Sequence, residues 1–493
     1  MFTRTTPFGP VVPSNPVCRN SPHLKPQLAF SHSLIPKQQT LIRSFGGWMR
    51  SSISISLDQS EVNMEQREPP KSRLKLEMEL DRFSDLPSDV IEKILSRLPI
   101  REAARTSVLS SNWRYRLAML RHLVFDDRCV STQKHITFVD IVDHVLLGHI
   151  GPIHKFRLSH RGGLANWDID RWILHLSRNS IKEVILRNSG LCRYRIPSYL
   201  FSCQDIIHLE LLLCVLKPPP TFKGFRNLKS LVIERVTLAQ DVFQNLIACC
   251  PLLEKLTLLR PKFTHLKIDA PNLQFLYVEG FFEDVTFENT LNLTDVCISI
   301  YRRVGGRTWV CDNSNLVKFL VQLPLIQRLK GGGYFLQNLV VGSLSPKLPK
   351  LCLYLKFLSI MVNFNDPAEV LTVLCLLRSS PAVQELEISA GSALEELDFY
   401  AHQEVQAALS EVNSLYGNWI CPFTQLRVVK ISNICDVKNA LDFVRFLLLN
   451  SPVLKKMIVT PNDANDSLEL MKQFLWLGRA SVLSEIIFLD QNS

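Results

Sequence analysis

Short groups of apolar residues recur along most of this chain at a nearly constant spacing. Each group has the form apolar-x-x-apolar-x-apolar, as in Leu228-Leu231-Ile233. Seven groups begin 28, 25, 22, 25, 20 and 20 residues apart from residue 153 onward, and four more follow between residues 355 and 459. Within a group the alternation of apolar and polar positions is typical of a half-buried strand. This period predicts a repeat architecture in which each unit adds one strand to a parallel sheet.

The segments that return between strands also repeat. Amphipathic helices are predicted over 241–248, 367–377 and 437–449. Each is followed by a proline at the same offset before the next apolar group, namely Pro251, Pro381 and Pro452. Because proline cannot continue a helix, it ends the turn and starts the next strand. We therefore expect an α/β solenoid.

Two stretches depart from the repeat. Between Phe263 and Phe287 the predicted strands come at half the usual spacing, so irregular units are expected there. Residues 301–350 are interpreted as an insertion or a disrupted unit, because they contain Gly305-Gly306 and a glycine run from Gly331 to Gly333. Lys330–Gly333 lacks the strand-to-helix context of a phosphate-binding loop and is predicted to be a flexible loop.

The segment from Asp81 to Asp127 follows a helical period instead. Its first predicted helix lies between Pro87 and Pro99 and has apolar residues at Val90, Ile91, Ile94, Leu95 and Leu98. Two further short helices follow. A unit of fewer than about 50 residues cannot bury so many apolar side chains by itself. Part of this apolar surface is therefore expected to contact another protein.

This segment resembles an F-box, the helical module that docks substrate receptors on the Skp-type adaptor of cullin-based ubiquitin ligases. The resemblance rests on Asp85-Leu86-Pro87, Ile91, Ile94-Leu95, Leu98-Pro99, residues 104–110 and Trp113-Arg114-Tyr115. It departs from the plant pattern at Asn112, where a basic residue is usual. The adaptor-binding residues that the resemblance implies are Leu86, Pro87, Ile91, Ile94, Leu95, Leu98, Pro99, Leu109 and Trp113.

The rest of the chain is similar to leucine-rich repeats that end in an FBD domain. The unit Ile206-Leu209-Leu211-Cys214-Leu216 fits the full repeat pattern and predicts a small buried cysteine at Cys214. Residues 419–490 carry the FBD resemblance and predict a last unit, a helix over 467–477 and a final strand that together cap the solenoid. The predicted domains are a disordered basic leader (1–80), an F-box (81–127), leucine-rich repeats (128–418) and an FBD domain (419–493).

The net charge of +10 arises mostly in the leader. Residues 1–57 contain six Lys and Arg residues and no acidic residue, which leaves +4 for the remainder. This balance gives little support to nucleic-acid binding. The leader is interpreted as a disordered extension, with an organellar transit peptide as the alternative, and the chain is expected in the nucleus or cytoplasm. No apolar run reaches the roughly 18 residues needed to span a bilayer, so a soluble protein without membrane partners is predicted.

Signals for catalysis or metal binding are weak throughout. The 13 cysteines include no CxxC pair, and His144 and His149 have no cysteine or carboxylate cluster beside them. There is no G-x-S-x-G motif. We predict no catalytic residue, no cofactor and no metal.

Three functions remain open at this point. The first is the substrate-recognition subunit of an SCF-type ligase, which binds the adaptor through the F-box and an unknown protein substrate through the repeats. The second is a binding scaffold without a role in degradation, its F-box having decayed at Ser111-Asn112. The third is a receptor for a hormone-like acid, with Arg187, Arg235 and Arg260 near predicted strand ends as candidate ligands.

Overall fold

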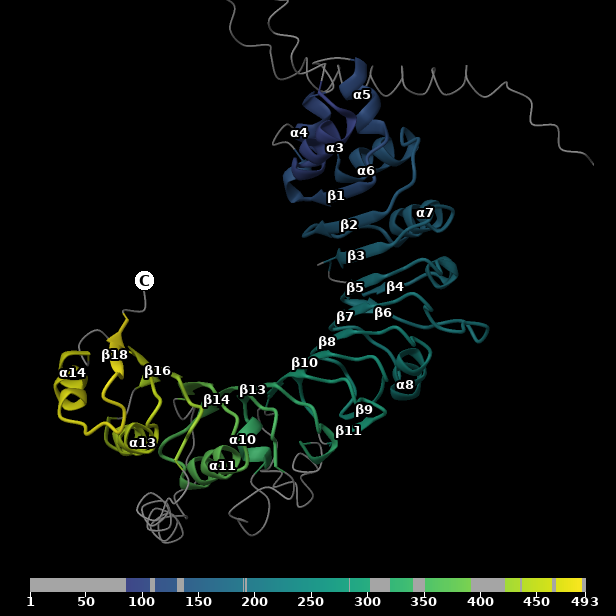
Figure 1. Ribbon diagram of the computed structural model, residues 1–493. Helices are drawn as coiled ribbons and strands as arrows, with labels where there is room; N and C mark the ends of the chain where they lie inside the picture. Colours follow the sequence, from purple (N-terminus) through teal and green to yellow (C-terminus); the bar gives the residue numbers. More distant parts are fainter. Residues whose placement is uncertain are drawn as a thin grey trace, which may run out of the picture.

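The computed structural model describes residues 86–106, 111–130, 137–188, 190, 193–282, 284–301, 320–339, 351–391, 422–434, 437–462 and 467–489. These residues form an arc (Figure 1). A long parallel sheet lines the inner side of the arc, and most helices lie on its outer side. Three short helices occupy one end and the last strand the other. The predicted α/β solenoid with a parallel sheet is confirmed.

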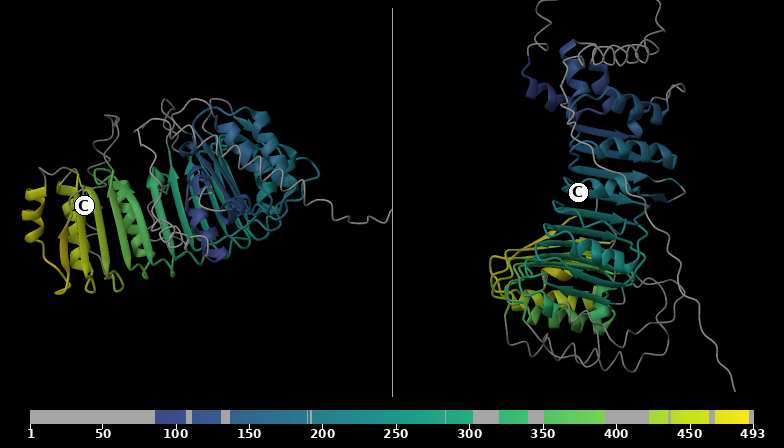
Figure 2. Two further views of the ribbon diagram at one scale, coloured as in Figure 1. Left: turned by 90° about the horizontal axis from the view of Figure 1, so that it is seen from above. Right: turned by 90° about the vertical axis from the view of Figure 1, so that its right-hand side faces the viewer.

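The main sheet contains 14 strands, each paired in parallel with the next along the solenoid. Figure 2 shows them side by side in one curved layer. In spatial order they are β1 (His122–Asp126), β2 (Lys155–His160), β3 (Glu183–Asn188), β5 (His208–Leu212), β7 (Ser230–Glu234), β8 (Lys255–Leu259), β10 (Phe275–Gly280), β12 (Asp295–Ile300), β13 (Arg328–Gly333), β14 (Phe357–Val362), β15 (Glu385–Ala390), β16 (Val428–Ile434), β17 (Lys456–Pro461) and β18 (Glu485–Phe488).

Helices connect many of these strands. The helices at the N-terminal end are α3 (Ser88–Arg97), α4 (Ile100–Thr106) and α5 (Ser111–Ala118). Those that return between strands are α6 (Phe138–Leu147), α7 (Asn166–Ser177), α8 (Gln240–Ala248), α10 (Phe335–Leu339), α11 (Pro367–Arg378), α13 (Val437–Asn450) and α14 (Ser467–Leu475), with 3-10 turns η2 (Asp127–Cys129) and η3 (Ser198–Ser202). The helices predicted before Pro251, Pro381 and Pro452 are confirmed as α8, α11 and α13. Within the described ranges, no helix is both long and apolar enough to cross a membrane.

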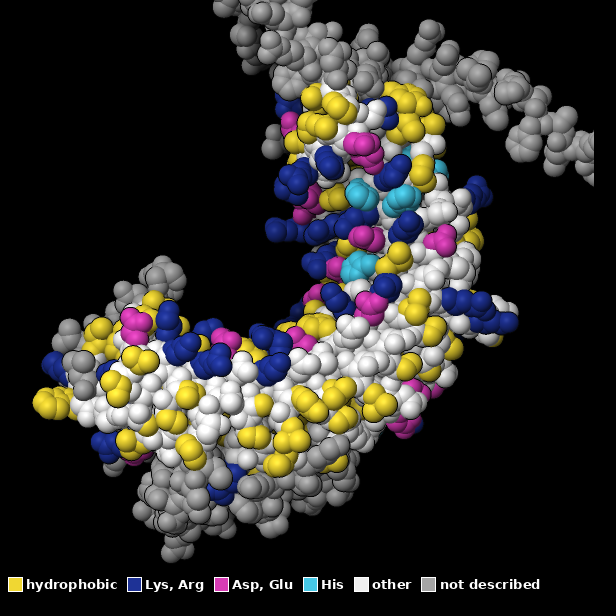
Figure 3. All heavy atoms as spheres, in the orientation of Figure 1, with side chains coloured by type: hydrophobic (Ala, Val, Ile, Leu, Met, Phe, Trp, Pro, Cys, Tyr) yellow, Lys and Arg dark blue, Asp and Glu magenta, His cyan; other side chains and the backbone are white. Residues whose placement is uncertain are grey.

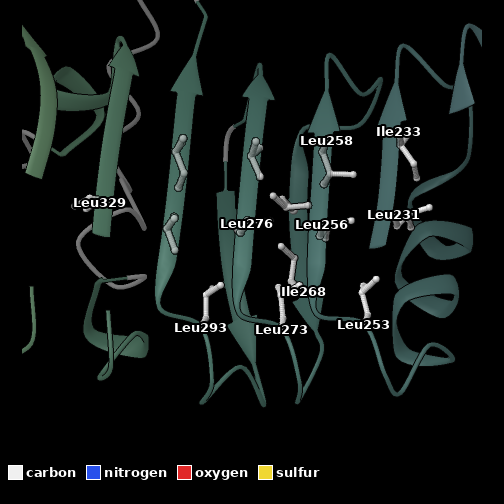
Figure 4. Close-up of a cluster of buried hydrophobic side chains, with 14 of the residues drawn as sticks. Leu231, Ile233, Leu253, Leu256, Leu258, Ile268, Leu273, Leu276, Leu293 and Leu329 are labelled. Carbon is white, nitrogen blue, oxygen red and sulfur yellow. The ribbon is translucent and has the colours of Figure 1, made fainter. Parts of the chain in front are cut away.

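The core is organised as two apolar columns that run across the sheet (Figure 4). One column joins the second residue of successive strands, as in Leu231, Leu256, Leu276 and Val296. The other joins the fourth residue. Because the strands are parallel and in register, each inward side chain is covered by its counterparts on the two adjacent strands. Most of these side chains are completely buried, so burial of each unit depends on its neighbours.

The irregular region around Phe263–Phe287 is confirmed and has a definite form. β9 (His265–Asp269) and β11 (Asp284–Glu288) form a separate two-stranded parallel sheet on the outer side of the arc. Return strands thus replace return helices in these units, which accounts for the short spacing. A second short pair, β4 (Tyr194–Arg195) and β6 (Cys214–Val215), includes the predicted buried cysteine, Cys214, which is 1% exposed.

The prediction of a flexible loop at Lys330–Gly333 was wrong, because these residues form part of β13. Gly331 occupies the inward column where the neighbouring strands carry Ile298 and Ile360. The ring of Phe335, from the helix that follows, fills the space that a side chain at Gly331 would need. A side chain from the following helix therefore fills the core at this point. Because β13 itself has glycine there, it lacks the apolar pattern that would identify it as a strand in the sequence.

Gly224, in the loop before β7, packs closely against the C-terminal end of α8. Its φ of +90° lies in the left-handed region, and a Cβ there would overlap the carbonyl oxygen of Cys249. We expect Gly224→Ala to lower stability by at least about 2 kcal/mol, from backbone strain and steric overlap together. Thermal or urea unfolding of the full chain measures this effect. Gly163→Ala is the control, because a methyl group added there would have no other atom within 4 Å; equal midpoints for the two variants would contradict the prediction.

Candidate functional site

The three N-terminal helices form a compact knob against the first strand of the sheet. α3 begins directly after Pro87, whose carbonyl oxygen accepts hydrogen bonds from the backbone N–H groups of Val90 (2.9 Å) and Ile91 (3.2 Å). α4 begins in the same way after Pro99, whose carbonyl accepts from the N–H of Ala103 at 2.9 Å. The fixed φ of proline suits the start of a helix. The two Leu-Pro pairs thus fix where the helices start.

The inner side of the knob belongs to the core of the whole chain. Ile91 and Leu95 are 0% and 1% exposed, and Trp113 is also buried. They lie in one continuous cluster with Leu123 and Phe125 of β1, and α4 contacts both β1 and η2. Much of the apolar excess seen in the sequence is therefore covered by the repeats and not by a partner. Ile91, Leu95 and Trp113 support the knob from inside.

The outer side of α3 carries the exposed part of the predicted site. Val90 and Ile94 are 39% and 36% exposed, and Pro87 precedes them on the surface. Leu86, Leu98 and Pro99 are half-buried, and Leu86 and Leu98 pack on the core cluster. The remaining predicted residue, Leu109, lies outside the described residues. We name Pro87, Val90 and Ile94 the α3 patch.

Val90 and the exposed Tyr115 were not among the residues predicted to bind the adaptor. Val90 lies four residues before Ile94, and this spacing places both on one face of α3. The neighbouring pair Ile91 and Leu95 has the same spacing on the adjacent face. The spacing identifies both apolar faces, but which one is covered depends on where α4 and α5 pack against α3.

Charged residues surround the knob. Arg116 of α5 donates to the hydroxyl of Ser88, Arg121 lies 3.8 Å from Glu92, and Arg105 lies 3.4 Å from Glu102. An open hollow of about 310 Å³ between α3 and the start of β1 is lined by Asp89, Glu92, Lys93, Ser96, Leu120, Arg121 and His122. The ion pair between Arg121 and Glu92 in its lining is largely exposed and contributes little stability.

The inner face of the arc is a second candidate surface, and its charges are largely paired across strands. Lys155 lies 2.7 Å from Glu183, and Lys229 lies 2.7 Å from Glu254. Burial raises the pKa of Glu210, but hydrogen bonds with His208 and Arg187 outweigh it and leave the pKa below its usual value. Such pairing gives the surface a pattern of alternating charge, which favours recognition of a protein over a single small anion.

The three arginines considered for a hormone-like acid do not form a common pocket. Arg187 hydrogen-bonds Glu210, and Arg260 lies 3.3 Å from Glu279 and 5.6 Å from the ring of Tyr301. Arg235 follows β7 in a left-handed turn with φ of +50°. These positions are spread over the strands from β3 to β8. The geometry gives no support to convergence on one carboxylate.

Most of the described cysteines are buried; Cys249 is exposed, and Cys297 and Cys375 are half-buried. Burial raises the pKa of the Cys214 thiol to about 12 and that of Cys203 to about 11. A thiol in that state is neither a good nucleophile nor a ready metal ligand. In the parts of the chain that the structure describes, no group of three or more His, Cys, Asp or Glu residues is arranged to hold a metal ion.

Three family models match the chain in the order of the fold. The F-box domain model matches residues 83–124, which contain the knob. The model described as the LRR repeats of FBD-associated F-box protein At5g56370 matches residues 169–388, and the FBD model matches residues 421–459. These families are protein-interaction modules.

Curated relatives of this chain come from Arabidopsis thaliana. F-box/FBD/LRR-repeat protein At1g13570 is 39% identical over 423 residues, which cover 83% of this chain and 99% of that protein. Putative F-box protein At3g58860 is 32% identical over 45% of this chain and 56% of its own length. Among solved structures, a TLR13-ssRNA13 complex matches with a TM-score of only 0.33 and 15% identity, over 69% of this chain and 46% of that chain. By the match to At1g13570 along nearly the whole of that protein, this chain belongs to the F-box/FBD/LRR-repeat family of plant proteins.

Proposed function

We propose that this chain is the substrate-recognition subunit of an SCF-type ubiquitin ligase. The observation that carries the proposal is the α3 patch: Pro87, Val90 and Ile94 are surface residues within the segment that matches the F-box model. A Skp-type adaptor that covers this patch would remove exposed apolar area from water, at about 25 cal/mol per Å². The inner face of the arc would then bind a protein substrate.

In this proposal the chain accelerates ubiquitin transfer without catalysing it. Holding a substrate beside a charged conjugating enzyme raises the effective concentration of the substrate's lysine. The bond-forming groups belong to other subunits, so no catalytic residue is required here. We further propose that this takes place in the nucleus or cytoplasm; the basic leader, whose alternative interpretation is an organellar transit peptide, lies outside the described residues.

The α3 patch provides a direct test of adaptor binding. We expect Val90→Asp combined with Ile94→Asp to reduce binding to a Skp-type adaptor at least tenfold, about 1.4 kcal/mol, because two charges would be desolvated at the interface. Affinity is measured with purified proteins by calorimetry or biolayer interferometry.

The matched control is Leu252→Asp combined with Leu291→Asp, two apolar residues of similar or greater exposure in turns of the repeats. This variant makes the same chemical change and should bind the adaptor normally. Melting curves of both variants report whether the fold survives. Unchanged adaptor binding by the Val90/Ile94 variant would remove the α3 patch from the proposal.

Assembly of the complete ligase separates a receptor from a scaffold. We expect the unmodified chain to co-elute with adaptor and cullin in one complex on size-exclusion chromatography. A chain that elutes apart from both, although folded, would indicate a repeat scaffold whose F-box no longer functions. The Val90/Ile94 variant, which we expect to elute alone, is the negative control for that experiment.

A further inference from the structure

Three exposed cations occupy the same position in neighbouring units of the C-terminal arm. Lys356, Arg427 and Lys455 each immediately precede a strand, β14, β16 and β17 respectively. We name them the basic row. Backbone hydrogen bonds of 2.8 Å link these positions through Gln384, the residue before β15. The N–H of Gln384 donates to the carbonyl of Lys356, that of Arg427 to Gln384, and that of Lys455 to Arg427. The three residues therefore lie along one line across the sheet.

The spacing of this line brings like charges close together. Adjacent strands are about 4.8 Å apart, so the backbones of Arg427 and Lys455, on adjacent strands, lie about 5 Å apart. The backbone of Lys356, two strands from Arg427, lies about 10 Å from it. Screening at physiological salt acts over about 8 Å, so exposed neighbours at this distance still repel. Figure 3 shows Lys and Arg side chains gathered along the inner side of this arm. Such a line costs stability in the isolated chain unless a counter-charge covers it.

The two carboxylates of β15 are already engaged. The Nζ atom of Lys430, the third residue of β16, lies 2.8 Å from Glu385 and 2.7 Å from Glu387. Among the described residues, no carboxylate lies within ion-pair distance of Lys356, Arg427 or Lys455. At the same position in the N-terminal arm, Arg121 reaches Glu92 and Lys229 reaches Glu254, while the exposed Lys182 before β3 has no ion pair with another described residue. In the C-terminal arm, three of the four successive positions before β14, β15, β16 and β17 carry such a cation.

We propose that the basic row binds an acidic segment of a protein target, with Asp or Glu side chains of an extended peptide paired to Lys356, Arg427 and Lys455. This inference rests on the proposed function and specifies what kind of substrate the repeats select. Side chains on one face of an extended peptide recur every 6.5–7 Å, roughly. A peptide lying across the strands can therefore place two or three carboxylates along a row of about 15 Å.

Two features favour a peptide over a nucleic acid. Single-stranded nucleic acids stack on series of exposed aromatic rings. Beside the row, Tyr354 is 53% exposed, but Phe357, which directly follows Lys356, is only 4% exposed. Its ring is covered by Arg328 and Lys330, whose charged groups lie 3.9 Å and 5.3 Å from its centre. In addition, Glu385 and Glu485 flank the row at the starts of β15 and β18. They would repel a phosphate backbone, which is charged at every nucleotide, whereas a peptide can place an uncharged residue opposite them.

The test uses the full chain and a fluorescein-labelled 12-residue peptide in which Glu alternates with Ser. Binding is followed by anisotropy at several salt concentrations, with the Gln version of the peptide as the neutral probe. The row variant is Lys356→Glu, Arg427→Glu and Lys455→Glu. The matched control is Lys217→Glu, Lys223→Glu and Arg226→Glu, which also reverses two lysines and one arginine, all exposed, in the loop before β7.

We expect the unmodified chain to bind the Glu peptide at least tenfold more tightly than the Gln peptide, with affinity falling as salt rises. The row variant should lose at least tenfold, and the control variant less than twofold. Equal losses in both variants would mean that only net charge matters, and no binding by the unmodified chain would also overturn the inference. A 12-nucleotide single strand that binds as tightly and depends on the same row would reassign the surface to nucleic acid. Adaptor binding, measured on the same samples, keeps this outcome separate from the proposed function.

Discussion

The inward side chains of each strand are covered by those of the two adjacent strands, and no unit covers its own. The two apolar columns run from Leu123 and Phe125 in β1 to Ile486 and Phe488 in β18. Each buried Leu, Ile or Val contributes about 1.5–3 kcal/mol relative to exposure, and only when its neighbours are in place. The in-register parallel sheet is thus a requirement of burial, and the outward positions are left free to carry charge.

The knob depends on the same columns. Its helices are too small to form a core, and they obtain one by packing Ile91, Leu95 and Trp113 beside the first strand. This explains why two apolar faces of α3 have different roles. One closes the end of the solenoid, and the other, with Val90 and Ile94, remains available to a partner.

Most of the sheet could be predicted from the sequence, because each strand contributes a complete apolar group at regular spacing. β13 could not, since its place in the second column is taken by Gly331 and filled by Phe335, a residue four positions later. The sequence also could not show which residues of the predicted adaptor site are buried in the chain and which are exposed. Ile91 and Ile94 are both apolar positions of one helix, and only the packing of α4 and α5 against α3 decides which is buried. The predicted domain bounds at residues 80, 127 and 418 stay predictions, although the main sheet has strands on both sides of the last two: β1 and β2 around 127, and β15 and β16 around 418.

The basic row follows from the register of the repeats. Lys356, Arg427 and Lys455 are up to 99 residues apart in the chain, but each directly follows the first residue of an apolar group: Leu355, Leu426 and Leu454. They are brought into line by the ladder of carbonyl and N–H groups before each strand. The sequence contains the shared position, and the parallel sheet turns it into a continuous surface.

The shared core between the knob and β1 has a mechanical consequence. Because the helices and the sheet are packed into one cluster, anything bound along the arc would be held at a fixed angle to whatever grips α3. Rigid attachment restricts which atoms of a bound protein can meet a second protein, much as a short stiff tether does. Curvature of the arc, and not chain flexibility, would then determine which lysines of a captured protein come within reach.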